Sequence, residues 1–89
     1  MDEQAKVALV TGASRGIGRS IAEALAGSGF IVVGTATSDA GAQSITQYLQ
    51  AAGNSGCGMT LKVGDEENIS GVIKTITKTY AAPLVLVNN

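Results

Sequence analysis

The chain has 89 residues, enough for one small domain or for part of one. Lys and Arg number 6 and Asp and Glu 7, so the net charge is -1, which argues against a nucleic-acid or membrane-surface partner. No apolar stretch reaches membrane-spanning length, and the polar start Met1-Asp2-Glu3-Gln4 is unlike a secretory signal. One cysteine and no histidine leave neither an internal disulfide nor a Cys/His metal site. These features favour a cytoplasmic protein.

The first predicted element is a strand at about residues 7–11, because an uncharged apolar run is typical of a strand buried on both faces. A glycine-rich turn follows it. Apolar residues then recur at helical spacing, namely Ile17, Ile21, Ala22 and Leu25. We expect this helix to span roughly 15–28 and to stop at Gly29, which accepts a left-handed conformation.

A second strand and helix follow. The strand is expected at Phe30 to Gly34, with Thr35-Ala36-Thr37 at its carboxyl tip. Ser38 can cap the next helix, and Asp39 suits its first turn. The residues that recur at helical spacing and predict its buried stripe are Ala42, Ile45, Leu49 and Ala52. Gly53-Asn54 ends it.

The third strand is predicted at Cys57 to Val63, on weaker grounds than the others. Asp65 is expected to cap a third helix, which Pro83 ends. The predicted buried face of that helix is Ile69, Val72, Ile73, Ile76 and Tyr80. Leu84 to Val87 then predicts a fourth strand, followed by Asn88-Asn89.

The alternating order β-α-β-α-β-α-β with apolar strands predicts an α/β fold, in which helices cover both faces of a parallel sheet. We expect a Rossmann-type doubly wound sheet with strand order 3-2-1-4 and ligand binding across the carboxyl ends of its strands. An apolar fourth strand at a sheet edge would expose an unpaired row of backbone groups. Residues 1–89 are therefore expected to be the N-terminal part of a single domain.

The glycines between the first strand and the first helix predict an anion site. The first N–H groups of a helix have no partners within it, and the helix dipole places partial positive charge there. Gly12, Gly16 and Gly18 would let a dinucleotide diphosphate approach those groups, which is the function that this context favours. The alternative is a tight turn that needs glycine only for packing.

The pattern Thr11-Gly12-x-x-x-Gly16-x-Gly18 resembles the TGxxxGxG loop of the short-chain dehydrogenase/reductase family. Asn88-Asn89 resembles the start of that family's NNAG motif. Three segments are similar to bacterial 3-oxoacyl-[acyl-carrier-protein] reductases: Val10 to Arg19, Gly34 to Ser38, and Gly41 to Gln43. The resemblance implies NADPH-dependent reduction of a 3-oxoacyl group on acyl carrier protein to the 3-hydroxyacyl form in fatty-acid biosynthesis. It also implies a homotetramer at full length.

The choice between NAD and NADP depends on the charge near the adenosine ribose. Counting about 20 residues past the last glycine reaches Asp39 and suggests NAD, but Ser38-Asp39 fits a helix start better. By resemblance, Ala36 occupies the position of the acid in NAD enzymes, whereas Thr37 and Arg15 resemble a clamp for the 2′-phosphate of NADP. NADPH is therefore the expected coenzyme.

The resemblance also assigns further coenzyme contacts. Lys62 and Val63 would line the adenine slot, although relatives carry Asp or Asn before that valine and Lys62 has no acceptor. Asn89 would contact the ribose and brace the strand. The full set of expected coenzyme-binding residues is Gly12, Ala13, Ser14, Arg15, Gly16, Ile17, Gly18, Thr37, Lys62, Val63 and Asn89.

No catalytic residue is expected within these residues. The family's Ser, Tyr and Lys, the last two in a YxxxK pattern, would lie beyond Asn89, and Tyr80 has no lysine four places on. Tyr48 and Tyr80 are interpreted as packing residues. Two other functions stay open: a short-chain reductase that acts on another alcohol or ketone, and a dinucleotide-sensing domain without catalysis.

Overall fold

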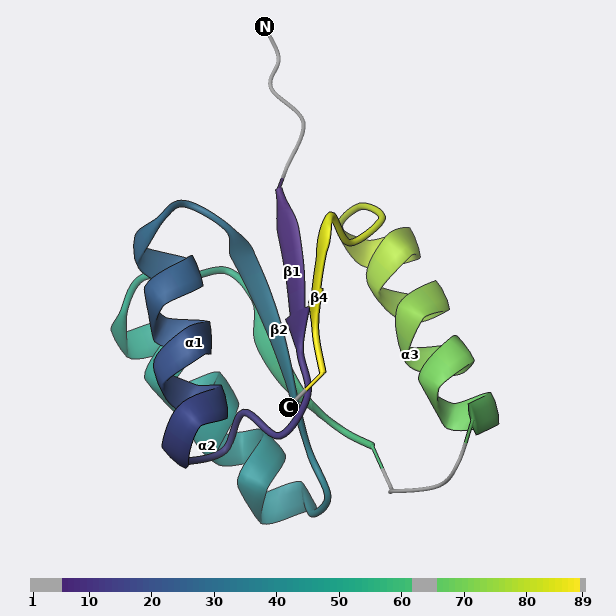
Figure 1. The fold of residues 1–89 in the computed structure, drawn as a ribbon, viewed down its shortest axis with the longest axis horizontal. Helices are drawn as coiled ribbons and strands as arrows, with labels where there is room; N and C mark the ends of the chain where they lie inside the picture. The colour runs from purple at the N-terminus through teal and green to yellow at the C-terminus, as the bar shows by residue number, and fades with distance from the viewer. Residues whose placement is uncertain (1–5, 62–65, 89) are drawn as a thin grey trace, which may run out of the picture.

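A computed structural model of the chain describes residues 6–61 and 66–88, with side chains from residue 69 onward in the second range. Its elements alternate strictly along the chain (Figure 1). They are β1 (Val7–Val10), α1 (Gly16–Gly27), β2 (Ile31–Ala36), α2 (Asp39–Ala51), β3 (Cys57–Thr60), α3 (Glu66–Thr79) and β4 (Val85–Val87). None of the helices in the described part of the chain has the length and apolar content needed to span a bilayer.

The four strands form one parallel sheet in the order β3-β2-β1-β4. β1 is central, with Val10 opposite Gly34 of β2 and Val87 of β4. Helices α1 and α2 cover one face of the sheet and α3 covers the other, as Figure 1 shows. The predicted Rossmann-type fold with strand order 3-2-1-4 is therefore confirmed.

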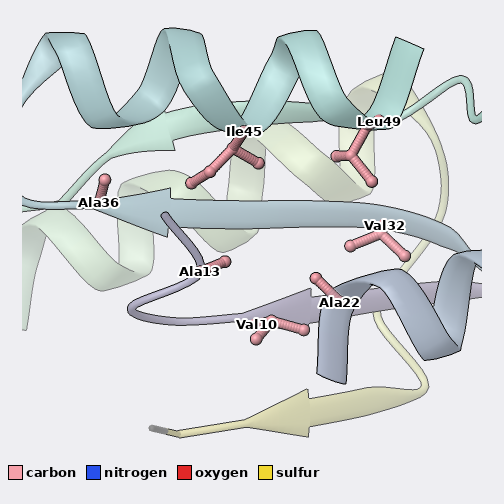
Figure 2. Packing of buried hydrophobic residues seen from close by; sticks show 7 residues of the cluster. All are labelled: Val10, Ala13, Ala22, Val32, Ala36, Ile45 and Leu49. Atoms are coloured by element: carbon pink, nitrogen blue, oxygen red, sulfur yellow. The ribbon is translucent and has the colours of Figure 1, made fainter. Parts of the chain in front are cut away.

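The core consists of two clusters, one on each face of the sheet. Because side chains alternate along a strand, Val10 and Val32 face α1 and α2, while Leu9 and Val33 face α3. The buried members on the α1/α2 face are Val10, Ala13, Ala22, Val32, Ala36, Ile45 and Leu49 (Figure 2). Those on the α3 face are Val7, Leu9, Val33, Val72 and Ile76. The sheet is thus sealed on both faces at β1.

Helix α2 packs directly over glycines of β2 and β3. A Cβ at Gly58 would lie 2.1 Å from the carbonyl oxygen of Ala42, and one at Gly34 would lie 2.9 Å from Cγ2 of Ile45. Real Cβ atoms do not approach so closely. The missing side chains therefore fix the distance between α2 and the strands that end at the site.

Several predicted boundaries are wrong in detail. β2 runs on to Ala36 instead of ending at Gly34, because Leu61 donates to the Ala36 carbonyl and extends the ladder with β3. Ala52, the C-cap of α2, is exposed. On α3, Val72 and Ile76 are buried as expected, but Ile69 is 42% exposed, because it lies in the first turns of the helix and belongs to neither cluster. The predicted cap Asp65 lies outside the described residues.

β4 is the least covered strand. Leu84 and Leu86 are 69% and 60% exposed in the part of the chain that the structure describes. Together with Leu9, Ile73 and Pro83, Leu86 lines a shallow pocket of about 150 Å³. β4 stands at the edge of the sheet, so it has one strand neighbour where β1 has two.

Candidate coenzyme site at the carboxyl ends of the strands

The candidate site lies where β1, β2 and β4 end. All three strands run the same way, so the segments that follow them meet at one edge of the sheet. The backbone N–H of Thr11 donates to the carbonyl of Val87 at 3.0 Å, and the Thr11 hydroxyl lies 3.2 Å from Oδ1 of Asn88. These contacts tie the start of the glycine-rich loop to the end of β4.

The loop between β1 and α1 contains two glycines in the left-handed region. Gly12 has φ 63° and Gly16 has φ 67°, conformations that L side chains rarely adopt. A Cβ at Gly16 would meet no protein atom within 4 Å, so packing alone does not require glycine there. The conformation requires it. This observation counts against the alternative in which the glycines serve only packing.

Between those glycines, Ala13 is held firmly. Its side chain is fully buried, and its N–H donates to the carbonyl of Thr35 at 2.9 Å. Its own carbonyl accepts a hydrogen bond from the hydroxyl of Tyr48 at 2.7 Å. Figure 2 shows Ala13 turned from the loop towards the core, among side chains of β2 and α2. The N–H and the carbonyl of Ala13 are thus both bonded within the protein, so Ala13 anchors the loop, and its expected contact with the coenzyme stays a prediction.

The N-terminus of α1 carries no cap of its own. Its N-cap residue, Arg15, is extended, with φ -163° and ψ 171°, and makes no side-chain cap hydrogen bond. The first turn contains no acidic residue. Arg15 and Gly16 are exposed, and Ile17 is 72% exposed. Backbone N–H groups, the helix dipole and a guanidinium thus combine where an anion can reach them.

The end of β2 supplies the second part of the site. Ala36 is the last residue of the strand, and the exposed Thr37 follows it directly. Since β2 lies beside β1 in the sheet, Thr37 and Arg15 belong to neighbouring connections at the same edge. Ser14 approaches the first turn of α2, because a Cβ built on Gly41 would lie 3.4 Å from Cβ of Ser14.

Asp39, the residue that simple counting assigns to the ribose, has another role. It stands in the first turn of α2, and its Oδ1 accepts a hydrogen bond of 2.8 Å from the hydroxyl of Thr60. Ser38 caps the same helix by accepting from the N–H of Gly41 at 3.1 Å. The interpretation of Ser38-Asp39 as a helix start is confirmed, and β2 ends at Ala36, whose side chain is buried.

Three expected coenzyme residues, Lys62, Val63 and Asn89, lie outside the described residues. Their assignment stays a prediction. Gly18, in contrast, is buried in the first turn of α1. Among the described residues, no group of three His, Cys, Asp or Glu could hold a metal ion.

Tyr48 is the residue whose role at the site the sequence did not reveal. It was expected only to pack, yet its hydroxyl bonds to the loop and its ring lies under Arg19, with Cζ 4.6 Å from the ring centroid. Burial raises the pKa of Tyr48 to about 12, with a further contribution from the charge of Glu23 and an opposing one from Arg19. The phenol therefore stays a donor at neutral pH. The sequence did contain one indication of this role. Tyr48 lies one helical turn from the buried Ile45, and the hydroxyl of a partly buried tyrosine normally has a hydrogen-bond partner.

The chain is similar to a known family and to several curated enzymes. The sequence model of the short chain dehydrogenase family matches residues 6–89. The 3-oxoacyl-[acyl-carrier-protein] reductase FabG of Vibrio cholerae is 54% identical over 89 residues, and that of Escherichia coli is 51% identical over the same length. Each alignment covers 100% of this chain and 35% of the relative, so the chain spans about a third of the length of these curated relatives.

The corresponding enzyme of Pseudomonas aeruginosa is 47% identical, again over 89 residues. The family match extends over nearly the whole chain, and it agrees with the parallel sheet. The chain therefore belongs to the short-chain dehydrogenase family.

Proposed function

We propose that residues 1–89 form the coenzyme-binding part of a single NADP-binding domain in an NADPH-dependent 3-oxoacyl-acyl carrier protein reductase. One observation carries this proposal: α1 begins without a cap, behind a glycine loop that is anchored at Ala13. The loop residues Gly12 to Gly18 would hold the diphosphate of the coenzyme. Backbone N–H groups at a helix start bind phosphate oxygens well because they are unpartnered within the helix and share its positive dipole end.

The preference for NADP over NAD rests on charge at the end of β2. An NAD enzyme places a carboxylate there to accept from the ribose hydroxyls, whereas this chain has Ala36. The nearest carboxylate along the chain, Asp39, already accepts from Thr60. Arg15 and Thr37 offer a cation and a hydroxyl to the 2′-phosphate, and a guanidinium can contact phosphate with two parallel hydrogen bonds.

The substrate part of the proposal comes from the relatives that are named 3-oxoacyl-[acyl-carrier-protein] reductases. Bound NADPH would supply a hydride to the 3-oxo group of an acyl chain on acyl carrier protein. The residues of this chain would hold and orient the coenzyme, and catalytic residues are expected beyond Asn89. A homotetramer in the cytoplasm is part of the same proposal.

The decisive experiment compares the two coenzymes in the full-length protein that carries this chain. Arg15→Ala should raise the Kd for NADPH about 10- to 100-fold, as expected for loss of one hydrogen bond to a charged group, and change that for NADH less than about 3-fold. Isothermal titration calorimetry gives both constants. Lys74→Ala is the matched control, because it removes an exposed cation from α3 on the other face of the sheet.

Equal losses for NADPH and NADH would contradict the 2′-phosphate assignment. Oxidation of NADPH by the full-length protein with a 3-oxoacyl thioester tests the reaction itself. Binding without that oxidation would favour a reductase of another alcohol or ketone, or a dinucleotide-sensing domain.

A further inference from the structure

Tyr48 connects α2 with the glycine loop and with α1, two segments that lie far from it in the sequence. It belongs to α2, its hydroxyl donates to the carbonyl of Ala13 in the glycine loop at 2.7 Å, and its ring faces the guanidinium of Arg19 on α1. Arg19 is itself held by Glu23, with Nε 3.1 Å from Oε2. The phenol is thus fixed at its ring and at its hydroxyl.

The bond from Tyr48 determines how the peptide after Ala13 is turned. The N–H of Ala13 donates to Thr35 and its side chain is buried, which leaves rotation about its Cα–C bond, the ψ angle, to turn the next peptide. A trans peptide is planar, and its C=O and N–H point in opposite directions. With the Ala13 carbonyl held towards Tyr48, the N–H of Ser14 faces away from Tyr48. Ser14 lies in the loop that would receive the diphosphate.

Gly12 and Gly16, on either side of the segment, have positive φ, a region that only glycine adopts readily. The hydrogen bond from Tyr48 adds a side-chain contact to the peptide between them. The raised pKa of Tyr48 keeps its hydroxyl protonated, so the bond is present throughout the neutral range.

We propose that Tyr48 is a positioning residue for the coenzyme diphosphate, which acts by fixing the Ala13–Ser14 peptide of the glycine loop. This inference rests on the proposed coenzyme site. It differs from the role of Arg15, because the diphosphate is common to NADPH and NADH whereas the 2′-phosphate is not. Tyr48 therefore sets affinity for both coenzymes and does not discriminate between them.

The test is Tyr48→Phe in the full-length protein, which keeps the ring and its contact with Arg19 and removes only the hydroxyl. The Kd values for NADPH and NADH should both rise about 3- to 10-fold, the range for one hydrogen bond. In steady-state kinetics KM for the coenzyme should rise while kcat stays within about 2-fold, because the reacting groups are untouched. Faster amide exchange at Ser14 by NMR would report the freed peptide.

Tyr80→Phe is the matched control. Its hydroxyl lies 3.3 Å from the carbonyl oxygen of Ser55, and its ring packs in the cluster on the α3 face, away from the loop. This variant should bind both coenzymes like the wild type. Unchanged binding by Tyr48→Phe, or an equal loss in Tyr80→Phe, would overturn the positioning role while leaving the proposed function intact. A wild-type protein that binds neither coenzyme would overturn both.

Discussion

Helices α1 and α2 begin at the same edge of the sheet, after neighbouring parallel strands, yet their first turns are built in opposite ways. Ser38 caps α2 by accepting from the N–H of Gly41 at 3.1 Å, and Asp39 adds negative charge to the first turn. At α1 the cap position holds Arg15, which makes no side-chain cap bond, and no acid stands in the first turn. The first turn of α2 thus has a side-chain cap for one of its N–H groups, and the first turn of α1 has none.

This difference separates a structural helix start from a binding one. A cap such as Ser or Asp contributes about 0.5–2 kcal/mol to stability, so Arg15 at the cap of α1 is a local loss. A cation is also unfavourable at the positive end of the helix dipole. Departures of this kind from local rules are expected at functional sites. An external anion would supply at α1 what Ser38 and Asp39 supply at α2.

The largest effect is expected when α1 receives a capping residue and a negative charge at its start, as α2 has. Arg15→Asp places a good cap at a position whose backbone is already extended, so the free energy of unfolding should rise by about 0.5–1 kcal/mol. NADPH affinity should fall about a thousandfold, because the charged hydrogen bond is lost and a carboxylate now faces the phosphates. Calorimetry and urea denaturation measure the two effects.

The opposite signs of these effects make the result decisive. A variant that is more stable yet does not bind NADPH cannot owe its loss of binding to unfolding. If Arg15→Asp is stabilised but binds NADPH like the wild type, the first turn of α1 does not hold the coenzyme.

The next largest effect is expected at Gly16. We compare it with Gly53, because both glycines have positive φ but only Gly16 lies at the candidate site. Gly16, at the start of α1, has φ 67°, and Gly53, after α2, has φ 77°. In both cases a Cβ would meet nothing within 4 Å, so alanine costs each about 1–2 kcal/mol of backbone strain. Gly16→Ala should in addition lower NADPH affinity about 10- to 100-fold, because the loop must shift its N–H groups away from the phosphates.

Gly53→Ala is the control for that measurement. It should show the same drop in thermal stability and no change in coenzyme binding. Equal binding by both variants would mean that the conformation of Gly16 serves only the fold.

The local patterns of the sequence predicted the architecture well. Apolar runs and helical spacing located every strand and helix, and Gly29 and Gly53 end α1 and α2 with positive φ as expected. The loop after β1 was also recognisable, since a strand, glycines and a helix follow one another directly. These features depend on neighbours in the sequence, which is why a single sequence reveals them.

Contacts between distant residues were not predictable in the same way. The bond from Tyr48 to Ala13 joins residues 35 apart and depends on how α2 sits over the sheet, which Gly34 and Gly58 determine. The extension of β2 to Ala36 likewise depends on pairing with β3. The exposure of Leu86 in β4 also depends on what lies beside an edge strand, which the residues of the strand do not encode.

The smallest effect is expected at the start of α2, the helix that has its own cap. Ser38→Ala removes the cap of α2 and should lower the free energy of unfolding by about 1 kcal/mol, while NADPH affinity changes less than about 2-fold. Ser20→Ala is the matched control: the same substitution in the exposed interior of α1 should raise stability by a few tenths of a kcal/mol, roughly, since alanine favours helix. If Ser38→Ala weakened binding as strongly as Arg15→Ala, both helix starts would serve the coenzyme. The distinction between a self-capped helix and a binding helix would then be wrong.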